Sequence, residues 1–273
     1  MELHRVIRKD ARRLLSTVWG RSLAAGLILL GVYLLIMTVE SALLFTFSGE
    51  DVFSFSALDL QTASTEAIVI TGGALLVSLL TLPPLALGYA RLHLSFAEGK
   101  TEGLEPLFLF FSSVRKLLAS AVFSVALTLR MGFCFALALT PGTLLASFLW
   151  FYMPVTSRTL QMLQIGACLL SVLLLLFCLS LALIFTRRWF LAPYYFARGE
   201  SVHRSFVLSV RATKGLHTKL MRFSLSFFGW AVLSLLILPM LWCVPYYSTA
   251  KALYAAYLTE RYERSLEPEE PEL

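Results

Sequence analysis

Long apolar runs separated by charged connections dominate the pattern of hydrophobic and polar positions along this chain. A helix needs about 20 apolar residues to cross a hydrocarbon layer of roughly 30 Å. Four runs have this length, at residues 23–47, 67–92, 117–139 and 160–185. The pattern predicts a transmembrane helix for each of them.

The last apolar stretch, residues 223–257, is too long for one ordinary span and contains Pro239 near its middle. Because proline removes a backbone donor and breaks a helix, we interpret the stretch as a tight hairpin of two short spans, 223–238 and 241–257. A single span over this stretch stays open as the alternative. The predicted fold class is thus an all-α integral membrane bundle of about six spans, with short amphipathic interfacial helices.

Prolines also predict irregularities inside two of the other spans. The pair Pro83-Pro84 predicts a bend in the second span. The string Thr140-Pro141-Gly142 predicts the end of the third helix. Residues 144–155, which contain the aromatic string Trp150-Phe151-Tyr152, are then expected to lie at the outer head-group level.

Two polar segments have the periodicity of amphipathic helices. Residues 1–21 place apolar side chains at helical spacing between arginines, which predicts a basic interfacial helix. Ser201 is expected to cap a second, short helix along the inner leaflet, with Val202, Phe206 and Val210 on one face. Residues 1–259 are expected to form one transmembrane domain, and the glutamate-rich residues 260–273 a disordered tail.

The placement of the basic residues predicts the topology. All but two of the 23 lysines and arginines lie at residues 5–21, 91–116, 187–222 and 251–264, whereas residues 48–66 carry only acidic charges. Because positive residues stay on the cytoplasmic side, both termini are expected inside. This predicts a multi-pass protein of a bacterial cytoplasmic membrane.

Composition and charge exclude several function classes. The chain is 58% hydrophobic and 15% charged, with a net charge of +6, and its charges flank apolar runs instead of forming a nucleic-acid stripe. Its four cysteines and four histidines (His4, His93, His203 and His217) have no ligand spacing, and the histidines are interpreted as surface or interfacial residues. We therefore expect no nucleic-acid partner, no cofactor or metal, and no enzymatic activity.

Glu40 and Arg130 are the charged residues expected inside the membrane. A lone charge there costs at least ~2.5 kcal/mol on insertion scales, and their depths below the outward ends of their spans match. The hypothesis is an ion pair that faces the bundle interior. The pair could be structural, could line a substrate path, or the two residues could fail to meet.

The basic connection after the fourth span supplies candidate contacts to anionic lipid head groups. Alternatively, these residues only fix the topology. The candidates are Arg187, Arg188, Arg204, Arg211, Lys214, Lys219 and Arg222, with Arg198 in the same connection.

Several strings, in this order, resemble a bacterial family of polytopic membrane proteins catalogued as a domain of unknown function (number 975). One departure is that about 50 residues, including the fourth span, separate the Pro-Gly string from the Ala-Pro-Tyr string. The resemblance implies a membrane protein and no particular activity. The strings are Val18-Trp19-Gly20-Arg21, Leu87-Gly88-Tyr89-Ala90-Arg91, Ala97-Glu98-Gly99-Lys100 with Leu107-Phe108, Leu139-Thr140-Pro141-Gly142, Ala192-Pro193-Tyr194, residues 201–215, Leu225-Ser226-Phe227-Phe228-Gly229-Trp230 and Val244-Pro245-Tyr246.

The sequence leaves two candidate functions. The favoured one is a non-enzymatic membrane scaffold that contacts anionic lipid or a protein partner, including a second copy of the chain. The alternative is a transporter or exporter of a small or lipidic molecule, because proline-interrupted spans and intramembrane charges can line a binding cavity.

Overall fold

The computed structural model describes residues 2–47, 64–100, 103–152 and 158–266, and all regular structure within them is helical. The helices, with two short 3₁₀ segments labelled η, are α1 (Glu2–Phe47), α2 (Thr65–Ala97), η1 (Glu105–Phe111), α3 (Val114–Tyr152), α4 (Arg158–Thr186), η2 (Arg187–Trp189), α5 (Ala192–Ala197), α6 (Val202–Ala212), α7 (His217–Leu225), α8 (Phe228–Leu233) and α9 (Ile237–Arg264).

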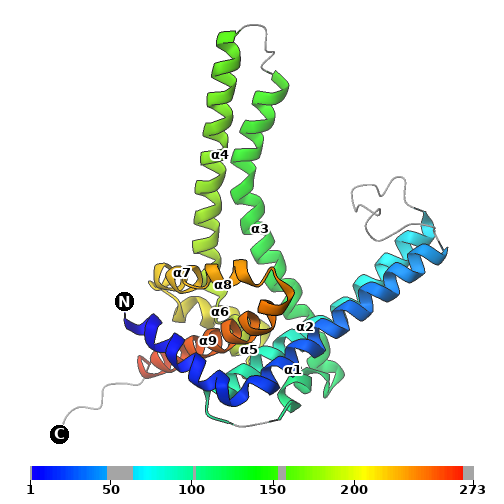
Figure 1. Ribbon diagram of the computed structural model, residues 1–273, viewed down its shortest axis with the longest axis vertical. Helices are drawn as coiled ribbons and strands as arrows, with labels where there is room; N and C mark the ends of the chain where they lie inside the picture. The colour runs from blue at the N-terminus through cyan, green and yellow to red at the C-terminus, as the bar shows by residue number, and fades with distance from the viewer. Residues whose placement is uncertain (1, 48–63, 101–102, 153–157, 267–273) are drawn as a thin grey trace.

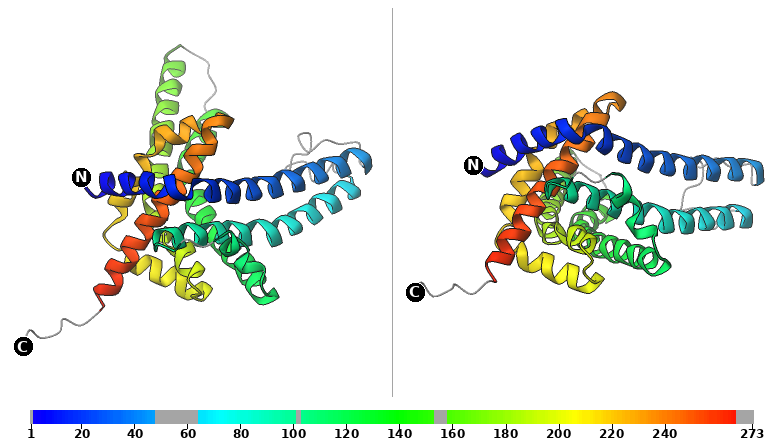
Figure 2. Two further views of the ribbon diagram at one scale, coloured as in Figure 1. Left: turned by 60° about the horizontal axis from the view of Figure 1, so that its bottom comes forward. Right: turned by 90° about the horizontal axis from the view of Figure 1, so that it is seen from below.

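The first two long helices form a hairpin that projects from the centre of the molecule (Figures 1 and 2). Ser64 caps the start of α2, because its hydroxyl accepts a hydrogen bond from the Ala67 amide at 3.1 Å. The helix then continues through Pro83 and Pro84 to Ala97, beyond the predicted end of the second span. The acidic connection at residues 48–63, expected on the outer side, lies outside the described residues.

The next two long helices, α3 and α4, form a second hairpin that leaves the centre in a different direction (Figure 1). They approach closely at Gly142, where an added β-carbon would lie 2.8 Å from the β-carbon of Leu175. The prediction that Thr140-Pro141-Gly142 ends the helix is wrong, because α3 continues to Tyr152 with Pro141 inside it. A proline inside a membrane helix is tolerated where the surrounding backbone groups find other partners.

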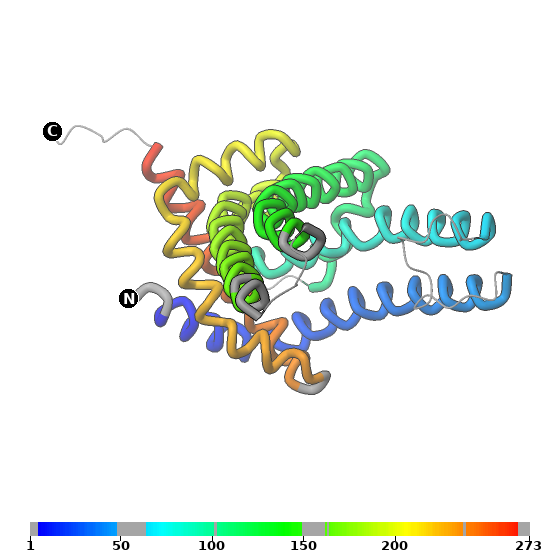
Figure 3. The backbone as a smooth tube through the Cα atoms, turned by 90° about the horizontal axis from the view of Figure 1, so that it is seen from above, coloured from blue at the N-terminus to red at the C-terminus, as the bar shows by residue number. Residues whose placement is uncertain are grey.

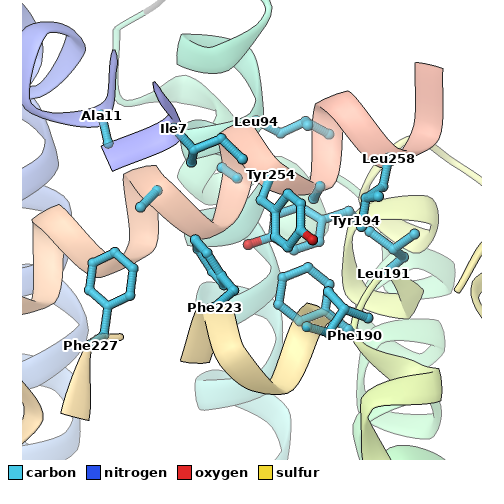
Figure 4. Packing of buried hydrophobic residues seen from close by; sticks show 14 of the residues in the cluster. Ile7, Ala11, Leu94, Phe190, Leu191, Tyr194, Phe223, Phe227, Tyr254 and Leu258 are labelled. Atoms are coloured by element: carbon cyan, nitrogen blue, oxygen red, sulfur yellow. The ribbon is translucent and has the colours of Figure 1, made fainter. Parts of the chain in front are cut away.

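A compact core joins the two hairpins at their bases, and α9 crosses it (Figures 2 and 3). Figure 4 shows Phe190, Phe223 and Tyr254 packed together in this core, with Ile7 and Ala11 of α1 on its other side. The ring centroids of Phe223 and Tyr254 are 4.7 Å apart, and those of Phe190 and Tyr254 are 6.1 Å apart. Residues far apart in sequence are therefore held together by burial of aromatic surface.

Within the described residues, four helices are long and apolar enough to span a membrane, and not the predicted six. The candidate spans are Arg5–Phe47, Thr65–Ala97, Val114–Phe148 and Gln164–Ala197. The expected spans 223–238 and 241–257 are divided instead between the short helices α7 and α8 and the first three quarters of α9. Alanines and aromatic residues of α9, such as Ala250, Tyr254 and Ala255, are buried in the core, so their apolar surface contacts protein and not lipid.

The basic N-terminal segment is also part of the core. We expected residues 1–21 to form a separate interfacial helix, but α1 is continuous from Glu2 to Phe47. Ile7, Ala11, Leu15 and Val18 recur at helical spacing and are all buried. This apolar stripe packs on protein, while the intervening Arg5, Lys9 and Arg13 are exposed.

Candidate functional site

The basic connection after α4 folds back against the base of α3 and is fixed there by backbone contacts. The Ser209 hydroxyl of α6 donates a hydrogen bond to the Arg188 carbonyl oxygen at 2.7 Å and accepts one from the Leu191 amide at 3.1 Å. Phe206 of α6 stacks on Phe123 of α3, with ring centroids 5.1 Å apart. The connection is therefore a rigid part of the molecule.

Ser201 caps α6 as predicted, and part of the apolar face of this helix packs on protein. The Ser201 hydroxyl accepts a hydrogen bond from the Arg204 amide at 3.4 Å. Phe206 of the predicted apolar face is buried, as is Ala212. Val210 of that face, 37% exposed, points outward together with the polar side chains of α6.

Four of the seven predicted lipid contacts are exposed on or beside α6 and α7. Arg211 lies at the end of α6, Lys214 just after it, and Lys219 and Arg222 on α7. None of the four has a carboxylate within 4.0 Å among the described residues. Arg204 differs because it pairs with Glu200 at 3.1 Å. We call the four unpaired residues the basic face.

Arg187 and Arg188 lie deeper than the basic face, in η2 at the end of α4, and both are half-buried. The guanidinium of Arg188 lies 3.9 Å from the ring centroid of Phe185. Beside it, burial and the charge of Arg188 lower the pKa of His217 from its ordinary value. The site therefore combines exposed cations with two partly desolvated ones.

Arg198 has a different role from the other arginines of the connection. Its guanidinium lies 3.0 Å from a Glu98 oxygen at the end of α2 and 3.4 Å from a Glu263 oxygen of α9. It thereby ties together three elements of the core. From the sequence we grouped Arg198 with the lipid contacts, because it lies in the same connection. The sequence did not indicate that Glu98 and Glu263 are its partners.

The structure does not bring Glu40 and Arg130 together. Glu40 is 8% exposed and lines a cavity of about 390 Å³ between α1 and α2. Arg130 stacks on Phe206 of α6, with 4.2 Å from the guanidinium carbon to the ring centroid, and donates to the Ala126 carbonyl oxygen at 2.9 Å. No ion pair joins them in the part of the chain that is described, so each charge has its own local surroundings.

His93 was expected at the surface and is instead 1% exposed. Its Nε2 atom lies 3.2 Å from the Ser22 hydroxyl of α1, and its Nδ1 atom lies 3.2 Å from the Thr249 hydroxyl of α9. Tyr89 packs edge-on against its ring at 4.5 Å. The only sequence signal for this burial is that His93 continues an apolar run past the predicted end of the second span at Leu92.

The direction of these hydrogen bonds follows from the donors present. Thr249 donates its one hydroxyl hydrogen to the Pro245 carbonyl oxygen at 2.8 Å, so His93 must donate from Nδ1 to Thr249. The Nε2 atom then accepts from Ser22. The order Ser–His–Thr resembles that of a nucleophile and its base, but Ser22 and Thr249 are both 0% exposed. The enclosed network links three helices and offers no access to a substrate.

Lys251 is a further cation, for which the sequence indicated only a role in topology. It lies on α9 with its Nζ atom 5.6 Å from the ring centroid of Phe190. Burial, and next the charge of Arg187, lower the pKa of this lysine. Two basic residues, one from η2 and one from α9, are therefore close enough to repel each other.

Possible metal ligands do not converge in the described ranges, which contain no group of three His, Cys, Asp or Glu side chains suited to an ion. No curated protein and no solved structure matches the chain. Residues 1–262 match the family described as "Protein of unknown function (DUF975)", and the chain, with four candidate membrane spans, belongs to that family.

Proposed function

We propose that this protein is a non-enzymatic membrane scaffold that holds a compact helical core against the anionic inner leaflet of a bacterial cytoplasmic membrane. The observation that carries the proposal is the basic face, whose four cations lie within residues 211–222, exposed and without carboxylate partners among the described residues. Each lysine or arginine near an anionic leaflet contributes about 1 kcal/mol of attraction. Four such residues on a rigid support are enough to orient the core.

The topology follows from the same proposal. With α1 to α4 as spans, both termini, the basic face and the basic residues of α9 lie on one side, which is the cytoplasmic side under the positive-inside rule. The core is then the cytoplasmic end of the molecule, and the two hairpins are its membrane anchors.

The hairpins leave room for protein partners. In the most apolar part of each candidate span, at most 11% of the residues are buried within the molecule. Such helices present side chains almost all round to lipid, to other membrane proteins or to a second copy of the chain. A scaffold that recruits partners through its spans is consistent with this exposure.

The test is lipid selectivity of the purified full-length protein in mild detergent. Native mass spectrometry would compare binding of phosphatidylglycerol and phosphatidylcholine, both with oleoyl chains, at two salt concentrations. We expect a preference for phosphatidylglycerol that weakens with salt, because exposed charges are screened. The variant Arg211→Gln/Lys214→Gln/Lys219→Gln/Arg222→Gln should lose much of this preference.

A matched control removes four positive charges elsewhere on the same side, in Arg115→Gln/Lys116→Gln/Arg261→Gln/Arg264→Gln. It should retain more of the preference than the variant of the basic face. Equal binding of the two lipids by the wild-type protein would overturn the proposal, and equal loss in both variants would show that only total charge matters.

Transport of a small or lipidic molecule is the second candidate, favoured by one observation. The cavity between α1 and α2 has one charged residue in its lining, Glu40, and Gly73 and Ala74 opposite it leave space beside the carboxylate. A transporter that used this cavity would lose substrate movement in Glu40→Gln while keeping its lipid preference. An unchanged flux in proteoliposomes would remove this candidate.

A further inference from the structure

A cavity of about 460 Å³ lies at the membrane end of the core, where α7 and α8 pass the base of α4 (Figures 1 and 3). Its lining is largely apolar and comes from α4, η2, α7, α8 and α9. Leu225 and Phe228 at its rim are exposed by more than half of their surface. An exposed apolar rim beside a membrane span places the cavity in reach of lipid chains.

The polar atoms of the cavity lack partners. Arg187 and Ser224 both line it, and the Nε atom of Arg187 and the hydroxyl of Ser224 are buried without a hydrogen-bond partner among the described residues. Buried polar atoms without partners are uncommon, since each loses its bonds to water. Two such donors on residues that line one cavity indicate that an acceptor is missing there.

The positive charge of Arg187 favours an anion as the missing acceptor. Arg187 has no carboxylate within 4.0 Å in the described part of the chain. It directly follows Thr186, the last residue of α4, so its guanidinium lies where a span ends and lipid phosphates collect. Guanidinium groups bind phosphate through two parallel hydrogen bonds.

We propose that this cavity is a specific site for one anionic phospholipid, whose phosphate binds Arg187 and Ser224 while an acyl chain fills the apolar lining. The site rests on the proposed function, since it deepens general attraction to anionic lipid into one defined position. It also accounts for the position of α7 and α8, because these short helices form the wall that separates the acyl chain from the surrounding bilayer.

The test measures stabilisation of the delipidated full-length protein in detergent. Phosphatidylglycerol should raise the unfolding temperature saturably, whereas phosphatidylcholine and inorganic phosphate should have much smaller effects. The variant Arg187→Gln should weaken the apparent affinity for phosphatidylglycerol at least tenfold. The control Arg115→Gln removes one exposed charge outside both the cavity and the basic face and should leave that affinity within twofold of wild type.

Two further variants keep the test informative if Arg187→Gln does not fold. Arg187→Lys retains the charge and should retain more of the binding than Arg187→Gln does. Ala231→Phe, in the cavity wall, fills the space for the acyl chain, keeps every charge, and should also weaken binding tenfold. Circular dichroism and size-exclusion chromatography would establish that each protein is folded.

The outcomes separate the site from the general proposal. If wild type prefers phosphatidylglycerol but the glutamine and Ala231→Phe variants bind it as tightly, the site is wrong and the scaffold proposal stands. Equal protection by inorganic phosphate would mean a small-anion site and would also overturn the lipid site. If wild type does not distinguish the two lipids in any assay, both proposals fail.

Discussion

The backbone oxygen of Leu107 lies against Gly88 so closely that a β-carbon at Gly88 would be only 1.9 Å from it. Leu107 belongs to η1, and Gly88 lies in α2 four residues after Pro84. The absence of a side chain at this one position thus allows η1 to pack against α2. The clash cannot be relieved by a rotamer change, because the contacted atoms are backbone atoms.

Gly88→Ala is therefore expected to destabilise the protein by about 2–3 kcal/mol, at the upper end of overpacking effects. Thermal unfolding in detergent would measure this. Gly72→Ala, in the same helix but with nothing within 4 Å of the added carbon, is the matched control and should be neutral or slightly stabilising. Similar unfolding temperatures for the two variants would contradict the close packing of η1 on α2.

The network around His93 predicts a non-additive pair of substitutions. Ser22→Ala leaves the Nε2 acceptor of a buried imidazole unpaired, which costs about 1–3 kcal/mol. In the background of His93→Phe the same change removes no such bond, so its cost should fall close to zero. A double-mutant cycle of unfolding free energies checks this, with exposed Ser16→Ala of α1 as the control. Equal costs in both backgrounds would show that the hydrogen bond contributes nothing.

Hydropathy predicted the four long spans because runs of about twenty apolar residues are uncommon in soluble proteins. It misplaced the stretch 223–257 because an apolar residue count does not distinguish surface that contacts lipid from surface that contacts protein. The surfaces of Ala250 and Tyr254 are of the second kind, because both residues are buried against protein. The charge distribution could not correct this, since four spans and six spans both leave the two termini on the same side.

The candidate site shows the same division between local and long-range information. Ser201 capping and the exposed cations of α6 and α7 follow from local sequence, and the structure has them as expected. The partners of His93 are 71 and 156 residues away along the chain, and no local pattern encodes such distances. Pairing Glu40 with Arg130 relied on equal depth alone, which says nothing about which hairpin each residue occupies.

Glu40 and Arg130 should now behave as independent residues. Arg130→Gln removes the contact with Phe206, a cation–π interaction of about 0.5–2 kcal/mol, and Glu40→Gln changes only the cavity between α1 and α2. The destabilisation of the double variant should equal the sum of the single effects within about 0.5 kcal/mol. A double variant that is markedly more stable than this sum would restore the ion pair.

Acid should destabilise the folded protein through His217. Its pKa in the folded state is lowered from 6.5 by burial and by Arg188, so the unfolded chain takes up a proton at higher pH than the folded chain does. The stabilising contribution is complete above pH 6.5 and is lost as the pH falls through the lowered value, below which both states are protonated. Unfolding temperatures between pH 8 and pH 5 should therefore decline less in His217→Gln than in wild type. His203→Gln, at an exposed position of α6, should decline like wild type, and an identical decline in all three proteins would mean that other groups cause the acid sensitivity.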